Sequence, residues 1–111
     1  MARTLIWSAG AHADLNEIET YIAASSPENA RRVVAKIRQA ANKQLDFPYS
    51  ARMVPELHDP NRREIFVYQY RVMYRVEPDR IEVLRVVHGR RLLKNVPGSF
   101  EESAQADYSA A

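Results

Sequence analysis

The sequence predicts an α+β fold with the element order β-α-α-β-β-β(-β), in which a helical hairpin packs on one face of a small antiparallel sheet. Apolar residues recur at helical spacing over residues 8–45 and alternate with polar residues over residues 51–88. The length of 111 residues and the hydrophobic content of 46% suit one compact domain. We therefore expect a single domain over residues 1–97, followed by an acidic tail over residues 98–111 that is a short helix or disordered.

The first half of the chain predicts one strand and two helices. Residues 3–8 (RTLIWS) are apolar and flanked by small residues, which is typical of a short strand. The first helix begins near Ser8. The second begins at Ser26, a favoured N-cap residue, with Pro27 at its first helical position, and it ends before Pro48. The apolar stripes are Ala11, Leu15, Ile18 and Ile22 in the first helix and Ala30, Val33, Ile37, Ala41 and Leu45 in the second. The other face of the second helix carries Arg31, Arg38 and Lys43.

The second half predicts one weak strand and three strong ones. Residues 51–57 (ARMVPEL) form at most an irregular edge strand, because Pro55 cannot donate a hydrogen bond to a neighbouring strand. The turn pair Pro78-Asp79 joins the last two strands in a tight hairpin. The strong strands, rich in β-branched and aromatic residues, are residues 63–69, 70–76 and 80–88.

A hairpin centred on this turn fixes which side chains share a face of the sheet. We expect Val76, Arg75, Tyr74, Met73 and Arg71 to pair with Ile81, Glu82, Val83, Leu84 and Val86, respectively. The side facing the helices then holds Val72, Tyr74, Val76, Ile81 and Val83. The open side holds Arg71, Met73, Arg75, Leu84, Val86 and His88. Arg71 and His88 are therefore expected to be diagonal neighbours on the open side.

Two arginines of this hairpin have structural interpretations. Arg75 lies opposite Glu82, so a cross-strand ion pair is the favoured reading. Arg85 points toward the helices by parity. Either an acid such as Asp14 or Glu17 pairs with it, or a β-bulge re-aims it.

Charge is unevenly distributed along the chain. The formal net charge is +2, but the last fourteen residues carry three acidic and no basic residues, which leaves 16 basic against 11 acidic residues, a net charge of +5, in the part before them. Thirteen of the sixteen basic residues are arginine, which forms two-pronged hydrogen bonds to phosphate or carboxylate groups. This bias fits either an anionic partner or an ordinary soluble surface.

The residues present exclude several classes of site. The chain has no cysteine, which rules out disulfides and thiolate catalysis and suits the cytoplasm. No apolar run approaches the roughly 18 residues that a membrane span requires. His12, His58 and His88 lack metal-ligand spacing and no glycine-rich phosphate loop occurs, so no cofactor or metal is expected. His88 is either a general base or a structural residue at the end of its strand.

Several segments, in their order and spacing, resemble the RelE/ParE superfamily of toxins from bacterial type II toxin–antitoxin systems. The resemblance covers about residues 3–94 and is carried by WSAGAHADLNEIETYI, SPENARRVVAKI, LDFPYSARMVPEL, REIFVYQYRVMYRV and IEVLRVVHGRR. It implies the fold expected above and a growth-inhibiting toxin that a cognate antitoxin binds and neutralises. The antitoxin is expected to cover apolar residues of the helical hairpin, namely Leu15, Ile18, Ile22, Val33 and Ile37.

The superfamily has two branches with different targets. RelE-type toxins cleave messenger RNA in the ribosomal A site without a metal, whereas ParE-type toxins poison DNA gyrase and have no assigned nuclease chemistry. If the chain is RelE-like, the resemblance implies that its catalytic residues are Arg71, His88 and Arg91. For either target, the residues expected to bind it are Arg63, Arg71, His88, Arg90 and Arg91.

Departures from the RelE pattern favour the ParE branch. RelE-type nucleases carry lysines on the strand before Arg71, where this chain has Arg62 and Glu64. Near the place of a C-terminal tyrosine in many of them it has Pro97, and its ending VVHGRRLL is common in the ParE branch. The favoured function is growth inhibition by gyrase poisoning, without enzymatic activity, in a module of the plasmid-stabilisation type. The alternatives are a ribosome-dependent mRNA endoribonuclease and a degenerate member that binds its antitoxin without being toxic.

Overall fold

The computed structural model describes residues 3–89, and its helices and strands follow the predicted order. The elements are β1 (Thr4–Trp7), α1 (Ala9–Ala23), α2 (Pro27–Lys43), β2 (Arg52–Met53), β3 (Arg62–Val67), β4 (Tyr70–Val76) and β5 (Arg80–His88). The predicted α+β class is confirmed. The expected tail over residues 98–111 lies outside the described residues, as do Arg90 and Arg91.

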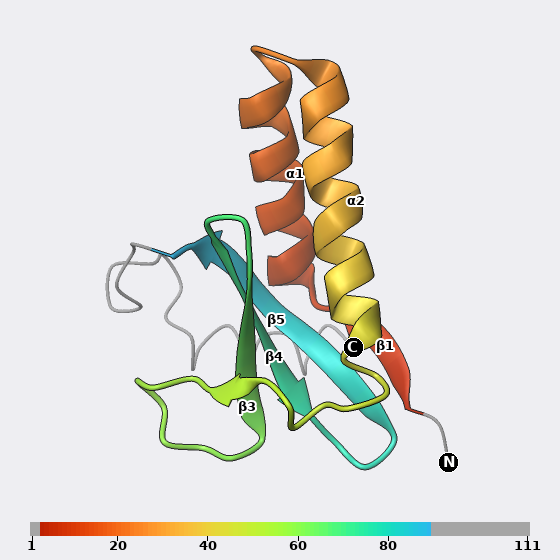
Figure 1. The fold of residues 1–111 in the computed structure, drawn as a ribbon, viewed down its shortest axis with the longest axis vertical. Coiled ribbons are helices and arrows are strands. Elements are labelled where there is room, and N and C mark those ends of the chain that lie inside the picture. Colours follow the sequence, from red (N-terminus) through yellow and green to blue (C-terminus); the bar gives the residue numbers. More distant parts are fainter. Residues whose placement is uncertain (1–2, 90–111) are drawn as a thin grey trace.

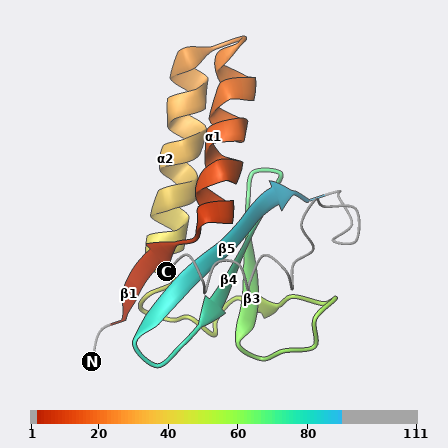
Figure 2. The same ribbon diagram turned by 180° about the vertical axis from the view of Figure 1, so that it is seen from behind.

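The strands form one sheet in the order β1-β5-β4-β3-β2, and the two helices lie side by side against one side of it (Figure 1, and from behind in Figure 2). Neighbouring strands are antiparallel except for β1 and β5, which are parallel. A parallel pair needs a long crossover connection, and the helical hairpin begins that connection. The predicted antiparallel sheet is therefore confirmed apart from this edge strand.

Both helices begin at serine N-caps. Oγ of Ser8 accepts a hydrogen bond from the backbone N–H of Ala11 at 3.0 Å, and Oγ of Ser26 accepts one from Asn29 at 3.1 Å. Pro27 occupies the first turn of α2, as predicted. The main core lies between the helices and the sheet and contains Ala11, Leu15, Val33, Ile37 and Ala41 from the helices and Val67, Tyr70, Val72, Val83 and Val86 from the strands.

The opposite face of the sheet has a smaller core of its own, formed by Val54, Met73, Leu84 and Val87 with Leu57 beside it. Val54 and Leu57 come from the turn that follows β2. The backbone N–H of Val54 donates to the carbonyl of Arg62 at 3.0 Å, and that of Leu57 donates to the carbonyl of Val54 at 3.1 Å. This short segment therefore covers part of the face that the helices leave open.

A β-bulge changes the register in the middle of the β4–β5 hairpin. Near the turn, three predicted pairs are confirmed, namely Tyr74 with Val83, Arg75 with Glu82 and Val76 with Ile81. Leu84 is the extra residue of the bulge, and it shifts the rest of β5 by one position. Met73 and Arg71 consequently pair with Arg85 and Val87, instead of the predicted Leu84 and Val86.

Adjacent residues of a strand point to opposite faces of the sheet. The shift by one position therefore moves each side chain in the last part of β5 to the face opposite the predicted one. Val86 lies in the core under the helices rather than on the open face. His88 pairs with Tyr70, and the two rings meet edge to face with their centroids 6.0 Å apart. The prediction that Arg71 and His88 share the open face was therefore wrong, and Val87 takes the place beside Arg71.

Two side chains at the start of α1 fasten this helix to the bulge. The hydroxyl of Ser8 donates to the carbonyl of Leu84 at 2.9 Å. Oδ2 of Asp14 accepts from Nε of Arg85 at 2.7 Å and from the backbone N–H of Val86 at 2.8 Å, and Oδ1 accepts from Nη2 of Arg85 at 3.0 Å. The two alternatives predicted for Arg85 occur together, since it lies at a bulge and pairs with Asp14.

Replacing Asp14 by alanine is expected to lower the free energy of unfolding by about 3 kcal/mol, because a largely buried Arg85 loses its carboxylate partner and the N–H of Val86 loses its acceptor. Asp14→Asn should cost less, since an amide oxygen still accepts one of these hydrogen bonds. Urea denaturation measures each change. Glu17→Ala removes an exposed acid from the same helix and should change stability by less than about 0.5 kcal/mol. Equal losses for the two alanine variants would contradict a stabilising role of Asp14.

Candidate functional site

Arg71, the arginine expected to act at the target, is buried and fully engaged by two carboxylates. It lies on β4 and is 5% exposed. Its Nε donates to Oε1 of Glu64 at 2.9 Å, and its Nη2 donates to the same oxygen at 2.5 Å. Its Nη1 and Nη2 donate to the two oxygens of Glu56 at 3.0 and 2.9 Å. The guanidinium is thus held by one carboxylate from the neighbouring strand and one from the segment after β2.

The strand register explains why Glu64 reaches Arg71. On β3, Phe66 lies directly opposite Arg71, and Glu64 lies opposite Met73, so Glu64 is a diagonal neighbour on the same face. The carboxylate of Glu64 is completely buried and also accepts from Nε of Arg52 at 2.5 Å. The guanidinium of Arg52 lies over the ring of Phe66, 5.3 Å from its centroid. We call Arg52, Glu56, Glu64 and Arg71 the Arg71 cluster.

The Arg71 cluster balances two positive against two negative formal charges. The hydrogen bonds from Arg71 hold the pKa of the Glu56 carboxyl below its usual value, although partial burial works in the opposite direction. The pairing with Glu56, and further with Glu64, raises the pKa of Arg71. Glu56 and Arg71 are therefore charged at neutral pH, and two carboxylates offset the positive charge that Arg71 could present to an external anion.

A second arginine on β4 is paired in the same way. Nη2 of Arg75 donates to Oε1 of Glu82 at 2.6 Å and to Oε2 of Glu77 at 2.7 Å. The predicted cross-strand pair of Arg75 with Glu82 is thereby confirmed. Burial raises the pKa of Glu77, but the hydrogen bond and charge of Arg75 together with Arg80 outweigh it, and the net pKa is lowered.

Of the expected target-binding residues, the three that lie within residues 3–89 are not brought together. Arg71 is buried on one face of the sheet, and His88 lies on the face toward the helices. The side chain of Arg63 bends back onto the protein. It donates to the carbonyls of Pro60 at 2.8 Å and Ala51 at 3.0 Å, and its guanidinium lies over the ring of Tyr49. Arg90 and Arg91 lie outside the described residues.

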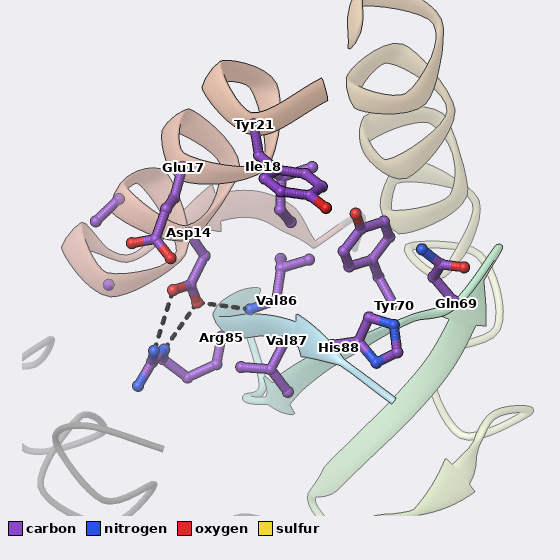
Figure 3. Close-up of a pocket in the computed structure, with 12 residues that line it drawn as sticks. Asp14, Glu17, Ile18, Tyr21, Gln69, Tyr70, Arg85, Val86, Val87 and His88 are labelled. Atoms are coloured by element: carbon purple, nitrogen blue, oxygen red, sulfur yellow. Dashed lines mark hydrogen bonds and ion pairs between the residues drawn. The ribbon is translucent and has the colours of Figure 1, made fainter. Parts of the chain in front are cut away.

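A groove of about 680 Å³ opens between α1, the beginning of β4 and the end of β5 (Figure 3). Ile18 and Tyr21 line it from α1, and Tyr70 and Val86 line it from the sheet. The ring of Tyr21 is 80% exposed although it borders an apolar surface. The ion pair of Asp14 with Arg85 and the side chains of Glu17, Gln69 and His88 make the rest of the lining polar. We call this the α1–β5 groove, and its mixed lining suits a peptide segment better than a small apolar ligand.

The residues predicted to bind an antitoxin are divided between the core and the surface. Leu15, Val33 and Ile37 are buried in the main core and offer no surface in this conformation. Ile18 and Ile22 are half-buried, and Ile18 lines the α1–β5 groove. All five belong to the apolar stripes that the helical periodicity predicted. The periodicity could not distinguish the residues buried against the sheet from those at the edge of a stripe.

Sequence reasoning missed Glu56, Glu64 and Tyr21 as the residues that define these two places. Glu64 could have been predicted from the strand pattern. It lies two positions before Phe66, the residue opposite Arg71, so its side chain points to the same face of the sheet. Tyr21 stands on α1 beside the apolar stripe rather than within it, which is a signal of an exposed aromatic residue. Glu56 lies outside regular structure, and no periodicity places its side chain.

Within residues 3–89, no three histidine, aspartate or glutamate side chains gather in a way that would hold a metal ion. None of the helices in this part of the chain is long and apolar enough to cross a membrane.

Comparison with known proteins identifies the family. The model of the ParE toxin of the type II toxin–antitoxin system parDE matches residues 5–93. The chain belongs to this toxin family. It is 28% identical to toxin RelE2 of Caulobacter vibrioides over 88 residues, which are 79% of this chain and 97% of the relative. The structure of a chromosomal ParDE toxin–antitoxin system from P. aeruginosa contains a chain with the same fold, at a TM-score of 0.65 and 23% identity, over 78% of this chain and 96% of that one.

Family membership makes this chain a toxin of a type II toxin–antitoxin system. The RelE/ParE-like fold predicted from the sequence is confirmed by the solved structure. The toxin thus combines a sheet whose two central arginines are neutralised internally with a groove beside α1.

Arg71→Ala is expected to lower the free energy of unfolding by about 3–5 kcal/mol, because it leaves the completely buried Glu64 with Arg52 as its only cation in the cluster. The double variant Arg71→Met/Glu64→Leu should recover a large part of this loss, since it removes both buried charges. Urea denaturation of Arg71→Met, Glu64→Leu and the double variant measures the coupling energy between the two residues.

An exposed arginine provides the control for this cycle. Arg31→Ala on α2 should change stability by less than about 0.5 kcal/mol. If the losses of Arg71→Met and Glu64→Leu simply add in the double variant, the Arg71 cluster does not stabilise the protein as a unit.

Proposed function

We propose that this toxin inhibits growth by binding and poisoning DNA gyrase in the cytoplasm, and that it does not cleave RNA. The observation that carries the proposal is the state of Arg71. Its guanidinium makes four hydrogen bonds to Glu56 and Glu64. A residue that stabilises the transition state of phosphate cleavage has to present its donors to the reacting phosphate, and these donors are occupied.

Two further placements argue against an assembled nuclease site in the described part of the chain. Glu64 stands on β3, the strand on which RelE-type nucleases carry lysines, and a buried carboxylate already paired with Arg52 and Arg71 cannot replace a lysine that contacts a phosphate. His88 lies on the opposite side of the sheet from Arg71, so these two groups cannot act on the same phosphate. A function by binding needs neither group to be free.

In this proposal, Arg71 holds the sheet together, and the target is bound by surface residues. Arg63, Arg90 and Arg91 remain the proposed cationic contacts, and His88, the last residue of β5, is a further proposed contact. Such contacts steer a protein toward an acidic or DNA-covered surface and weaken as salt concentration rises.

Purified toxin, incubated with gyrase, ATP and supercoiled plasmid, is expected to make linear DNA accumulate after the proteins are denatured, because a poison traps the cleaved enzyme–DNA intermediate. The amount of linear DNA is measured on a gel. Arg71→Lys should retain this activity in proportion to its folded fraction, since a lysine still neutralises Glu64. Arg90→Gln/Arg91→Gln should lose most of it without losing stability.

A parallel assay follows cleavage of messenger RNA by the toxin in the presence of translating ribosomes. The following combined result would show that the proposal is wrong: the toxin cleaves RNA in this assay, a folded Arg71→Lys variant does not, and active gyrase yields no linear DNA with the toxin. Induced expression without growth arrest, with folded toxin in the cell, would contradict any toxic function.

The α1–β5 groove is our proposed site for the cognate antitoxin. Its apolar lining and the exposed ring of Tyr21 are features of a surface that a partner covers. An aromatic ring at the rim of a groove commonly becomes a binding hot spot when a peptide segment buries it. Arg85 in the lining is paired with Asp14, so the apolar anchor of the contact would be Tyr21 with Ile18, and the polar side chains would form its rim.

Tyr21→Ala is expected to weaken antitoxin binding by about 2 kcal/mol, roughly thirtyfold, because the variant removes a large ring that the antitoxin would bury. Isothermal titration with the purified antitoxin measures the affinity. Phe47→Ala is the matched control, since Phe47 is 73% exposed but does not line the groove. Equal effects of the two substitutions would place the antitoxin elsewhere.

A further inference from the structure

The two helices of the hairpin carry opposite charge. α1 contains three acidic residues, Asp14, Glu17 and Glu19, and no arginine or lysine. α2 contains a single acid, Glu28, and five basic residues, which are Arg31, Arg32, Lys36, Arg38 and Lys43. The side chains of all five are exposed.

The five basic residues lie on the one side of α2 that faces away from the core. A helix turns by about 100° per residue, which places them on the arc opposite the buried Ala30, Val33, Ile37 and Ala41. With a rise of about 1.5 Å per residue, the row from Arg31 to Lys43 is about 18 Å long. We call these five residues the α2 basic face.

None of the five cations of the α2 basic face has an acidic partner among residues 3–89, a condition that only Arg3 and Arg63 share among the other arginines of this part of the chain. Nη1 of Arg32 donates to the neutral Oδ1 of Asn29 at 3.2 Å, and the guanidinium of Arg38 lies 5.3 Å from the ring centroid of Trp7. By contrast, ion pairs with carboxylates are made by Arg52, Arg62, Arg71, Arg75, Arg80 and Arg85. Most of the positive charge that has no carboxylate partner within residues 3–89 therefore lies on one helix.

We propose that the α2 basic face binds the phosphate backbone of duplex DNA. Charge complementarity carries the assignment, because the five cations extend over about 18 Å along the helix, roughly five base pairs of duplex, with Arg31 and Arg38 on one flank and Arg32, Lys36 and Lys43 on the other. The exposed residues between the cations are small or polar, such as Ala35, Gln39 and Asn42. A protein partner would need large apolar anchors at the centre of its contact, and this face has none.

The same face is better suited to a duplex than to a single strand. Proteins that bind single-stranded nucleic acid stack its bases on aromatic side chains, and α2 contains no aromatic residue. Contacts to a duplex backbone need only cations and hydrogen-bond donors, which arginine and lysine supply. The inference goes beyond gyrase poisoning and does not depend on it, since binding of DNA by the toxin alone tests it.

The test measures fluorescence anisotropy of a labelled duplex of about 30 base pairs, roughly three helical turns, as full-length toxin is added at several salt concentrations. The logarithm of the affinity should fall linearly with the logarithm of salt concentration, by about 0.9 for each phosphate contact. Arg32→Gln/Lys36→Gln should weaken binding by about tenfold or more at low salt and reduce the slope by about 2. Arg32→Lys, which keeps the charge, should bind like the unmodified toxin.

The control variant lowers the net charge by the same two units on the other helix. Asn16→Glu/Thr20→Glu changes two exposed positions of α1, so a mere effect of net charge would weaken binding equally in both double variants. The expected result is a clearly smaller effect with an unchanged slope. Circular dichroism at increasing temperature verifies that each variant is folded.

Three results would overturn the proposal. The first is the absence of salt-dependent binding to the duplex. The second is equal weakening by the α1 and α2 double variants, or equal or tighter binding to a single strand of the same length. The third is that the toxin does not bind the duplex while Arg32→Gln/Lys36→Gln lowers its affinity for the antitoxin. This result would make the α2 basic face a protein-binding surface.

Discussion

The bulge at Leu84 is the constraint on which the arrangement of this toxin depends. One extra residue in β5 sends Val86 and His88 toward the helices and leaves Val87 beside Arg71 on the other face. The bulge is held by α1, through the hydroxyl of Ser8 and the carboxylate of Asp14. Because the same contacts fix where α1 crosses β5, they also set the width of the α1–β5 groove.

The many arginines of the sheet serve mainly to pair with acids inside the protein. Arg71 and Arg75 on β4 each contact two carboxylates, and the carboxylates of Glu64 and Glu82 are themselves buried. Buried ion pairs add little net stability but are costly to break, so they fix the register of the strands more than they strengthen the fold. The central arginines of β4 are consequently engaged within the protein, and the surfaces that we propose for partners lie elsewhere, among them the α1–β5 groove and the α2 basic face.

The elements of the fold could be predicted because each has a local cause. Ser8 and Ser26 cap the helices, Pro27 starts α2, and Pro78 and Asp79 turn the last hairpin. The candidate site could be predicted only in part. Arg71 was identified as the central residue, but its partner Glu56 comes from an irregular segment whose path no periodicity describes. The position of His88 was missed because a single inserted residue inverts the parity of everything that follows it.

The sequence by itself determined the α+β class, the order of the elements and the apolar stripes of the two helices, and its motifs carried the resemblance to RelE/ParE toxins. The class, the order of the elements and the apolar stripes follow from the periods of apolar residues and from capping and turn residues, all of which act over a few neighbouring positions. Only the tertiary structure decided that Arg71 is neutralised, that His88 lies under the helices, and that most of the positive charge without a carboxylate partner within residues 3–89 lies on α2. Each of these depends on contacts between segments far apart in the chain, such as Asp14 with Arg85 and Glu56 with Arg71, and local patterns carry no information about such distances.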